Sequence, residues 1–360
     1  MDKCKLKKLS FFNFFDYYIK NMKVSENIDL SSLSYLKIGG QGKILIEIEK
    51  ESEIPKLMDI KNKERSPLFV IGDCANTVFK NGFHNKIFVK ITIDEILKTY
   101  EDKAWVNIVV GAGTNWDDLV KWTVKKRFSG LELLSGIPGT VGASPIQNIG
   151  AYGSEVSKTI THIKIFDLET ENFYEINNKD CQFGYRDSVL KHNIGKFIIT
   201  QVSFRLSKKK PEMPKYRDLS VFFLKTKNKI PTIKQIRDAV LEIRKEKLPD
   251  PKEIPNCGSF FKNPIVDNLR AEELLSHFPD MPQFQISEDE VKLSGGWLIE
   301  KSGFKGKEFN NLKVFNKNAI ILTSSGKASF RELENIRDKI TNGVEKNFSV
   351  HLEPEVNFIT

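Results

Sequence analysis

Three stretches of the sequence hold residue types that a buried core does not require, and the first is rich in glycine. It reads SGIPGTVGASPIQNIGAYG over residues 135–153, with glycines at positions 136, 139, 142, 150 and 153. Glycines this dense let the backbone approach a ligand closely and turn its N–H groups toward phosphate oxygens. Tight turns alone would not require the neighbouring Gln147, Asn148 and Tyr152. We therefore expect a cofactor-binding cradle here.

The second stretch, CQFGYRDS over residues 181–188, carries an arginine beside a tyrosine. The guanidinium of Arg186 is a planar fork that could grip a carboxylate together with Tyr185. A surface arginine paired with Asp187 is the alternative interpretation of the same residues.

The third stretch, LPDPKEIPNCGSFFKNP over residues 248–264, contains a serine that follows a rigid, proline-rich segment. Ser259 follows Gly258, and Lys262 and Asn263 come just after it. Because no G-x-S-x-G elbow surrounds Ser259, the sequence does not support a hydrolase triad.

Two shorter glycine motifs each follow a predicted strand. Gly111-Ala-Gly113 opens a helix as half of a dinucleotide-binding fingerprint would, but Trp116 stands where the third glycine belongs. The segment GDCAN, from Gly72 to Asn76, could equally be a plain turn from a strand to a helix. A classical Rossmann domain is therefore not predicted.

Two glutamates lie near the C-terminal end of the chain, in VHLEPEVNF over residues 350–358. A strand here would place Glu353 and Glu355 on the face opposite Leu352 and Val356. Pro354 cannot donate to a ladder, so we expect an edge strand or a strand end. A solvated glutamate pair is the simpler interpretation, and a site carboxylate is the more specific one.

Alternating strands and helices must position these residues. Period-two and helical patterns predict strands at 43–48, 68–71, 87–91, 106–110, 196–206 and 349–360, a hairpin at 160–168 and 173–176, and helices at 53–61 and 115–126. Two capping boxes, at Thr232 and Ser329, predict two further helices, the first ending before Pro249. The lysine- and proline-rich segment 207–230 predicts a domain boundary.

The composition fits a multidomain enzyme in a reducing compartment. The chain has 360 residues, of which 40% are hydrophobic and 29% charged, and it offers no apolar run long enough for a membrane span. Its four cysteines lie far apart without metal-ligand spacing, so neither a disulfide scaffold nor a metal site is predicted. The net charge of +9 comes from dispersed lysines, which argues against nucleic acid and suits anionic small molecules.

Residues 1–22 stand apart from this pattern. A basic start precedes FFNFFDYYIK, in which Asn13 and Asp16 interrupt the apolar run, and no cleavage site follows. We interpret the segment as a short appended helix or a mis-assigned start with Met22 as the true one, in preference to a membrane-surface helix. Its removal is expected to leave turnover nearly unchanged.

Taken together, the motifs resemble one family from about Leu36 to Thr360. The pieces that carry the resemblance are GIPGTVGASPIQNIGAYG (136–153), CQFGYRDS (181–188), GSFFKNP (258–264), KLSGGWLIEKSGFKG (292–306) and LEPEV (352–356). They stand in the order and spacing of UDP-N-acetylenolpyruvoylglucosamine reductases, flavoenzymes that complete UDP-N-acetylmuramate in peptidoglycan synthesis. The form of that family with a tyrosine loop is the one that matches.

The resemblance implies an α+β fold with a two-subdomain FAD-binding domain of the vanillyl-alcohol-oxidase type and a smaller α/β substrate-binding domain. The boundaries that we expect are an N-terminal extension at 1–22, the FAD-binding domain at 36–209 (subdomains about 36–95 and 96–209), the substrate-binding domain with its tyrosine loop at 210–348, and a C-terminal strand at 349–360. We also expect a cytoplasmic protein, as the composition favours, and a monomer.

The resemblance assigns roles to residues of this chain. Its catalytic residues are Arg186, Ser259 and Glu355. Its FAD-binding residues are Gly72, Asn76, Gly111, Gly113, Gly136, Gly139, Thr140, Gly142, Gln147, Asn148, Gly150, Ala151, Tyr152 and Gly153. Its substrate-binding residues are Tyr185, Tyr216, Lys247 and Asn263. No metal is implied.

The implied chemistry uses non-covalent FAD and NADPH as co-substrate. Hydride reaches C3 of the enolpyruvyl group, and negative charge spreads from C2 into the carboxylate. Arg186 and Glu355 in its acid form would stabilise that charge, and Ser259 would donate the proton to C2. A different flavin oxidoreductase and a non-catalytic nucleotide-sugar-binding homologue remain alternatives; no histidine lies in 136–153 to attach FAD covalently.

Three departures from the family pattern stand out. The usual G-x-G-S-N turn has Cys74 and Ala75 in place of a glycine and a serine. The usual Asn-Thr-Phe before the first strand reads Ser34-Tyr-Leu36, and Asn318 replaces a glutamine of the substrate site. Because the three catalytic positions are intact, we expect a working enzyme.

Overall fold

The structure is a computed structural model that describes residues 22–225 and 230–360. The expected N-terminal extension, up to residue 21, lies outside the described residues. The described chain divides into two compact units, and we describe each by itself. The first unit consists of residues 22–28, Gly42–Asp73 and Phe83–Glu242, and the second of Asp29–Gln41, Cys74–Gly82 and Ile243–Thr360.

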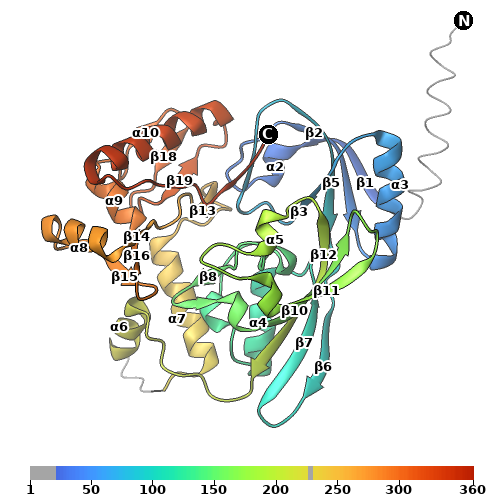
Figure 1. The fold of residues 1–360 in the computed structure, drawn as a ribbon, viewed down its shortest axis with the longest axis horizontal. Helices are drawn as coiled ribbons and strands as arrows, with labels where there is room; N and C mark the ends of the chain where they lie inside the picture. The colour runs from blue at the N-terminus through green and yellow to red at the C-terminus, as the bar shows by residue number, and fades with distance from the viewer. Residues whose placement is uncertain (1–21, 226–229) are drawn as a thin grey trace, which may run out of the picture. The chain divides into compact units, whose positions relative to one another are not determined.

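A four-stranded sheet forms one part of the first unit (Figure 1). Its strands, in spatial order, are β1 (Lys23–Asp29), β2 (Gln41–Ile48), β5 (Phe83–Ile91) and β3 (Leu68–Ile71). The helix α3 (Ile54–Glu64) has buried Ile, Leu and Met side chains along one face, as the helical spacing predicts. Strands β3 and β5 are parallel.

A five-stranded antiparallel sheet forms the other part of the first unit. Its spatial order is β11 (Phe173–Asn177), β10 (Ile160–Asp167), β12 (Phe197–Ser207), β7 (Trp105–Gly111) and β6 (Ile96–Glu101). The pairing of β10 with β11 confirms the predicted hairpin. The helix α4 (Trp116–Lys126) begins at the N-cap Asn115, shortly after β7 ends.

The remaining elements of the first unit are short, apart from one helix. They are β8 (Gly150–Ala151), β9 (Ser154–Glu155), α5 (Val189–His192), α6 (Arg217–Lys225) and α7 (Ile233–Lys247), whose last residues belong to the second unit. The predicted capping box of α7 is confirmed, because Thr232 N–H donates to Gln235 and Gln235 N–H donates to the Thr232 hydroxyl. The helix α6 lies inside the segment that the sequence marked as a boundary.

The second unit holds three small sheets. One has the order β13 (Asn256–Ser259), β19 (Ile321–Ser324), β18 (Leu312–Val314), β17 (Glu308–Phe309), and the next has β14 (Ile265–Asp267), β16 (Glu290–Leu293), β15 (Gln283–Gln285). The last is a parallel pair, β4 (Thr77–Phe79) with β20 (Asn357–Ile359). The helices are α2 (Leu30–Leu33), α8 (Asn268–His277), α9 (Gly295–Lys301) and α10 (Phe330–Phe348).

The C-terminal strand is shorter than predicted. Instead of a strand over 349–360, Ser349 caps α10 in a left-handed conformation, and regular pairing begins only at Asn357. Between them, Pro354 forms an isolated antiparallel bridge with Phe261. The missing N–H of Pro354 interrupts the ladder, which is the physical reason for the difference.

Each unit has its own hydrophobic core. The first core runs from Met22 to Leu206, and the second gathers Leu36, Val78 and residues from Cys257 to Val356.

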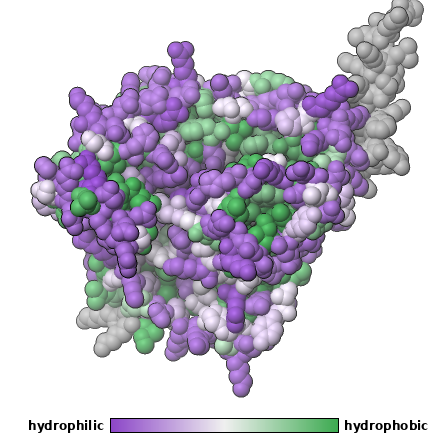
Figure 2. All heavy atoms as spheres, viewed as in Figure 1, coloured by the Kyte–Doolittle hydropathy of each residue, from purple (hydrophilic) through white to green (hydrophobic). Residues whose placement is uncertain are grey.

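Figure 2 shows polar side chains over most of the face in view, with apolar ones in small areas between them. In the described part of the chain, no helix has both the length and the apolar character that crossing a bilayer requires. Separate sheets and helices confirm the predicted α+β class.

Candidate active site

The predicted cradle packs against both shorter glycine motifs in the first unit. A Cβ on Gly72 would lie 3.1 Å from Thr140 Oγ1, and one on Gly142 only 2.6 Å from the Ala112 Cβ. The N–H of Gly142 donates to the Ala112 carbonyl at 2.8 Å. Three segments that sequence reasoning selected separately therefore lie together, and only glycine fits at position 142.

Two glycines of the cradle leave space beside the backbone. Gly139 and Gly153 have φ of 119° and 79°, and a Cβ at either would have no atom within 4 Å. The Thr114 hydroxyl nearby is buried without a hydrogen-bond partner. Open backbone and an unsatisfied polar atom are what a site for a bound cofactor provides, so these residues fit one.

Not every glycine N–H of the cradle points outward as expected. The N–H of Gly136 donates to Asp117 Oδ1 at 2.6 Å, and Asp117 also accepts two hydrogen bonds of 2.7 Å from the buried Arg237 on α7. This ion pair, which sequence reasoning missed, holds the start of the cradle. A bidentate arginine–carboxylate pair spanning 120 residues leaves no local signal.

Asn148 joins the cradle to the second stretch. Its side chain is fully buried, and its Nδ2 donates to Glu155 at 2.9 Å and to the Gly184 carbonyl at 3.0 Å. Its Oδ1 accepts the N–H of Ser157 at 3.1 Å. The side chain thus fixes the loop, so any contact with a cofactor would come from the Asn148 backbone.

Arg186 is held in an unusual conformation at the edge of the cradle. Its φ is 54°, in the left-handed region that arginine seldom adopts. One guanidinium nitrogen donates to the Gly150 carbonyl at 2.8 Å, and the guanidinium lies 5.3 Å from the Tyr185 ring centre. The Lys191 ammonium donates to the Arg186 carbonyl at 2.8 Å. These contacts aim the guanidinium along the cradle.

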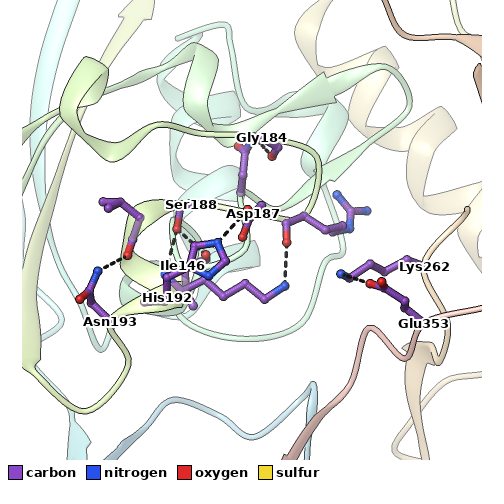
Figure 3. Close-up of polar contacts among 12 residues, drawn as sticks. Ile146, Gly184, Asp187, Ser188, His192, Asn193, Lys262 and Glu353 are labelled. Carbon is purple, nitrogen blue, oxygen red and sulfur yellow. Dashed lines mark hydrogen bonds and ion pairs between the residues drawn. The ribbon is translucent and has the colours of Figure 1, made fainter. Parts of the chain in front are cut away.

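The residues after Arg186 anchor this loop (Figure 3). The Ser188 hydroxyl donates to the Ile146 carbonyl at 2.6 Å. Nε2 of His192, on α5, lies 2.9 Å from Oδ2 of Asp187. Although burial opposes the change, the hydrogen bond and charge of His192 hold the pKa of Asp187 below its ordinary value. The Asp187 carboxylate is thus engaged by His192, next to Arg186.

Tyr216 contacts the far end of the cradle. Its ring meets that of Tyr152 edge to face, with the ring centres 5.3 Å apart. Burial raises the pKa of the Tyr216 phenol, with a further contribution from Asp218. The loop before α6 therefore reaches the residues predicted to bind the cofactor.

In the second unit, the structure brings Ser259 and Glu355 onto adjacent segments. The N–H of Glu355 donates to the Phe260 carbonyl at 2.8 Å, and the N–H of Lys262 to the Glu353 carbonyl at 2.9 Å. A side-chain ion pair of 2.8 Å between Lys262 and Glu353 adds to this link, as Figure 3 shows. Residues 91 and 95 positions apart in sequence thus share one short two-stranded register.

Asn76, Asn263 and Lys247 also lie in the second unit. Asn76 ends a turn that leads from β3 to another strand, β4, and not to a helix; its side chain donates to the Glu355 carbonyl at 3.0 Å. Asn263 accepts the N–H of Gly295 at 2.9 Å, and Lys247 is exposed at the end of α7. Arg186, which was predicted to act together with Ser259 and Glu355, belongs to the first unit.

The substituted positions are visible in the structure. Cys74, where the resembling family has glycine, keeps a glycine-like φ of 52°. Asn318 Oδ1 lies 3.2 Å from where a Cβ on Gly296 would be.

Burial raises the pKa of the Cys181 thiol to about 11 and of the Cys257 thiol to about 12. Within residues 22–225 and 230–360, no group of three His, Cys, Asp or Glu side chains is placed to hold a metal ion.

Comparison with known families matches both parts of the chain. The model described as "FAD binding domain" matches residues 43–171. The model described as "UDP-N-acetylenolpyruvoylglucosamine reductase, C-terminal domain" matches residues 250–359.

Individual relatives match over nearly the whole chain. The UDP-N-acetylenolpyruvoylglucosamine reductase of Flavobacterium johnsoniae is 36% identical over 94% of this chain and all of its own length. That of Dechloromonas aromatica is 35% identical over the same shares. The solved reductase of Thermus caldophilus aligns over 94% of this chain and all of its own with a TM-score of 0.64 at 22% identity. p-Cresol methylhydroxylase aligns over 97% of this chain and 90% of its own with a TM-score of 0.50 at 10% identity. These last two likenesses show the fold.

Proposed function

This chain belongs to the UDP-N-acetylenolpyruvoylglucosamine reductase family, and we infer that it reduces UDP-N-acetylglucosamine enolpyruvate to UDP-N-acetylmuramate in peptidoglycan precursor synthesis. The observation that carries the inference is an identity of 36% over the full length of a relative with that name. FAD is its cofactor, and the reaction is an oxidoreduction. NADPH is the electron donor that we propose, and the chain acts on small molecules.

The cradle residues are the ones that we propose to hold FAD. Gly139 and Gly153 offer open backbone, and Gly142 lets residues 139–144 pack against Gly111–Gly113. Thr140, Gln147, Gly150, Ala151 and Tyr152 complete the proposed set. When bound there, FAD supplies the two-electron chemistry that links NADPH to the substrate.

Arg186 is proposed to stabilise the negative charge that gathers on the substrate carboxylate. Its guanidinium stays permanently charged, and one of its N–H groups donates to the Gly150 carbonyl at 2.8 Å. A preorganised cation lowers the free energy of a charged transition state without having to reorient. The left-handed backbone at Arg186 is strain of the kind that persists at functional sites.

Ser259 and Glu355 are proposed to act on C2 and on the carboxylate of the substrate. A serine hydroxyl is a weak acid, and it serves here because the carbon that accepts its proton is strongly basic. The hydrogen bond between the Glu355 N–H and the Phe260 carbonyl fixes the two side chains on neighbouring segments. Glu355 in its acid form would donate a hydrogen bond to the developing carboxylate charge.

Four side chains are proposed to bind the rest of the substrate. Tyr216 and Tyr185 flank the cradle in the first unit, and Lys247 and Asn263 lie in the second. The ammonium of Lys247 is exposed and suits the diphosphate, while the amide of Asn263, oriented by the Gly295 N–H, suits the uridine. A cytoplasmic, monomeric enzyme is part of the same proposal.

A visible spectrum tests this function directly. We expect the purified protein to be yellow, to bleach anaerobically with NADPH, and to recover its absorbance when UDP-N-acetylglucosamine enolpyruvate is added. A colourless protein would favour a non-catalytic nucleotide-sugar-binding homologue. Bleaching that recovers with oxygen but not with the enolpyruvyl substrate would point to a different flavin oxidoreductase.

A further inference from the structure

The side chain of Asn76 is bonded to a residue 279 positions away. Its Nδ2 donates to the main-chain carbonyl of Glu355 at 3.0 Å. The Asn76 carbonyl in turn accepts from Asn357, from its backbone N–H at 3.0 Å and from its side chain at 3.2 Å. The turn that ends at Asn76 is therefore joined to the segment that carries Glu355.

Both main-chain polar groups of Glu355 are held by different segments. Its N–H donates to the Phe260 carbonyl at 2.8 Å, on the segment that follows Ser259, and its carbonyl accepts from Asn76. Since a side chain extends from its backbone along the Cα–Cβ bond, these two bonds set the direction in which the Glu355 side chain leaves the main chain.

Regular sheet pairing does not hold this part of the chain. The strand β20 begins at Asn357, and Pro354 makes only an isolated bridge, so Glu355 lies in a gap between ordered segments. Removal of the Asn76 amide would take away its hydrogen bond to the Glu355 carbonyl. A shift of about 1 Å at a catalytic group is enough to slow a reaction about a hundredfold.

We propose that Asn76 is a positioning residue that sets the orientation of Glu355, and not a residue that binds FAD through its side chain. The inference rests on the proposed catalytic role of Glu355. It assigns Asn76 an effect on the step in which the enolpyruvyl substrate is reduced, and none on the step in which NADPH delivers its electrons.

The test uses two variants and a matched control in the full-length, flavin-loaded protein. Asn76→Ala removes the donor, and Asn76→Asp keeps the shape but places a carboxylate oxygen against the Glu355 carbonyl. Asn81→Ala is the control, because Asn81 also joins distant segments of the second unit, by bonds to the Gly39 carbonyl and the Phe330 N–H. Flavin content, the unfolding temperature and both half-reactions are measured for each.

We expect both Asn76 variants to keep FAD and to be reduced by NADPH at the wild-type rate. Reoxidation by UDP-N-acetylglucosamine enolpyruvate should slow at least about tenfold in kcat, with a smaller change in KM. Asn81→Ala should lower the unfolding temperature without slowing reoxidation. Because Asn76 acts through Glu355, adding Asn76→Ala to Glu355→Gln should slow reoxidation little further.

Four outcomes would overturn the inference. Loss of FAD with normal reoxidation of the loaded fraction would return Asn76 to the cofactor site. Fully multiplicative effects in the double variant would mean that Asn76 acts independently of Glu355. Wild-type reoxidation in both Asn76 variants, together with slow reoxidation in Glu355→Gln, would show that Asn76 does not set the orientation of Glu355. Wild-type reoxidation in Glu355→Gln would remove the proposed role of Glu355 itself.

Discussion

The guanidinium of Arg186 donates to the carbonyl of Gly150 at 2.8 Å, which ties the residue proposed to stabilise substrate charge to the cradle proposed to hold FAD. A Cβ on Gly150 would lie 3.2 Å from the same guanidinium and 2.9 Å from the Ser154 carbonyl. The close approach therefore depends on glycine at this position, so the cradle and Arg186 specify each other's geometry.

Replacing Arg186 by lysine separates charge from geometry. Arg186→Lys keeps the positive charge but loses the planar fork that reaches both Gly150 and a substrate carboxylate. We expect bound FAD to remain and substrate-driven reoxidation to fall by about tenfold to a hundredfold. Stopped-flow absorbance of the flavin measures this, and a wild-type reoxidation rate would exclude Arg186 from the charge-stabilising role.

Tyr216→Ala should weaken substrate binding much more than it affects flavin reduction by NADPH. The Tyr152–Tyr216 ring contact places this loop at the cradle, and Tyr216→Phe preserves that contact, so it serves as the matched control. We expect KM for the UDP substrate to rise in Tyr216→Ala. Equal loss in the two half-reactions would show that the loop acts on the flavin and not on the nucleotide.

Gly142→Ala tests the packing of the cradle. The added methyl would meet the Ala112 Cβ at 2.6 Å, an overlap that backbone movement must relieve, and overpacking of this kind costs about 1–3 kcal/mol. We expect lower FAD content and a lower unfolding temperature. Gly184→Ala is the control, since its methyl would contact Asp187 at 3.6 Å; equal FAD content in the two variants would contradict the close-packed cradle.

Cys74 offers a stability test of a substituted position. Its φ of 52° disfavours any residue with a Cβ by about 1–2 kcal/mol. Both Cys74→Gly and Cys74→Ala remove the thiol, but only glycine relieves the backbone. We expect Cys74→Gly to be more stable than Cys74→Ala by about 1 kcal/mol in chemical unfolding. The reverse order would show that the left-handed backbone imposes no strain.

The sequence predicted the elements whose pattern is local. The long alternating strands β7 and β12 and the capping boxes of α7 and α10 have signals within a few residues, and the structure contains each of them. Short strands such as β4 and β17, of three and two residues, are too brief to show a period, so they were missed.

The site was predictable as residue types but not as connections. The cradle, Arg186 and Ser259 stand out because glycine clusters and a guanidinium beside an aromatic ring are visible in one stretch. The bond from Asn76 to Glu355 and the ion pair from Lys262 to Glu353 span 279 and 91 residues. Such contacts depend on the folded chain and leave no mark in a single sequence.

The proton transfer proposed for Ser259 is the central claim about the chemistry. NADPH-reduced, flavin-loaded protein is mixed anaerobically with UDP-N-acetylglucosamine enolpyruvate in D2O, and flavin absorbance and product mass are followed. Because the N–H hydrogen that reduced flavin transfers exchanges with solvent, wild-type protein should reoxidise and yield UDP-N-acetylmuramate with non-exchangeable deuterium at both C3 and C2. Ser259→Ala should keep FAD and be reduced by NADPH normally, yet reoxidise at least about a hundredfold more slowly, and Ser259→Cys should recover part of the loss. Folded, flavin-loaded Ser259→Ala that reoxidises at the wild-type rate would contradict the account.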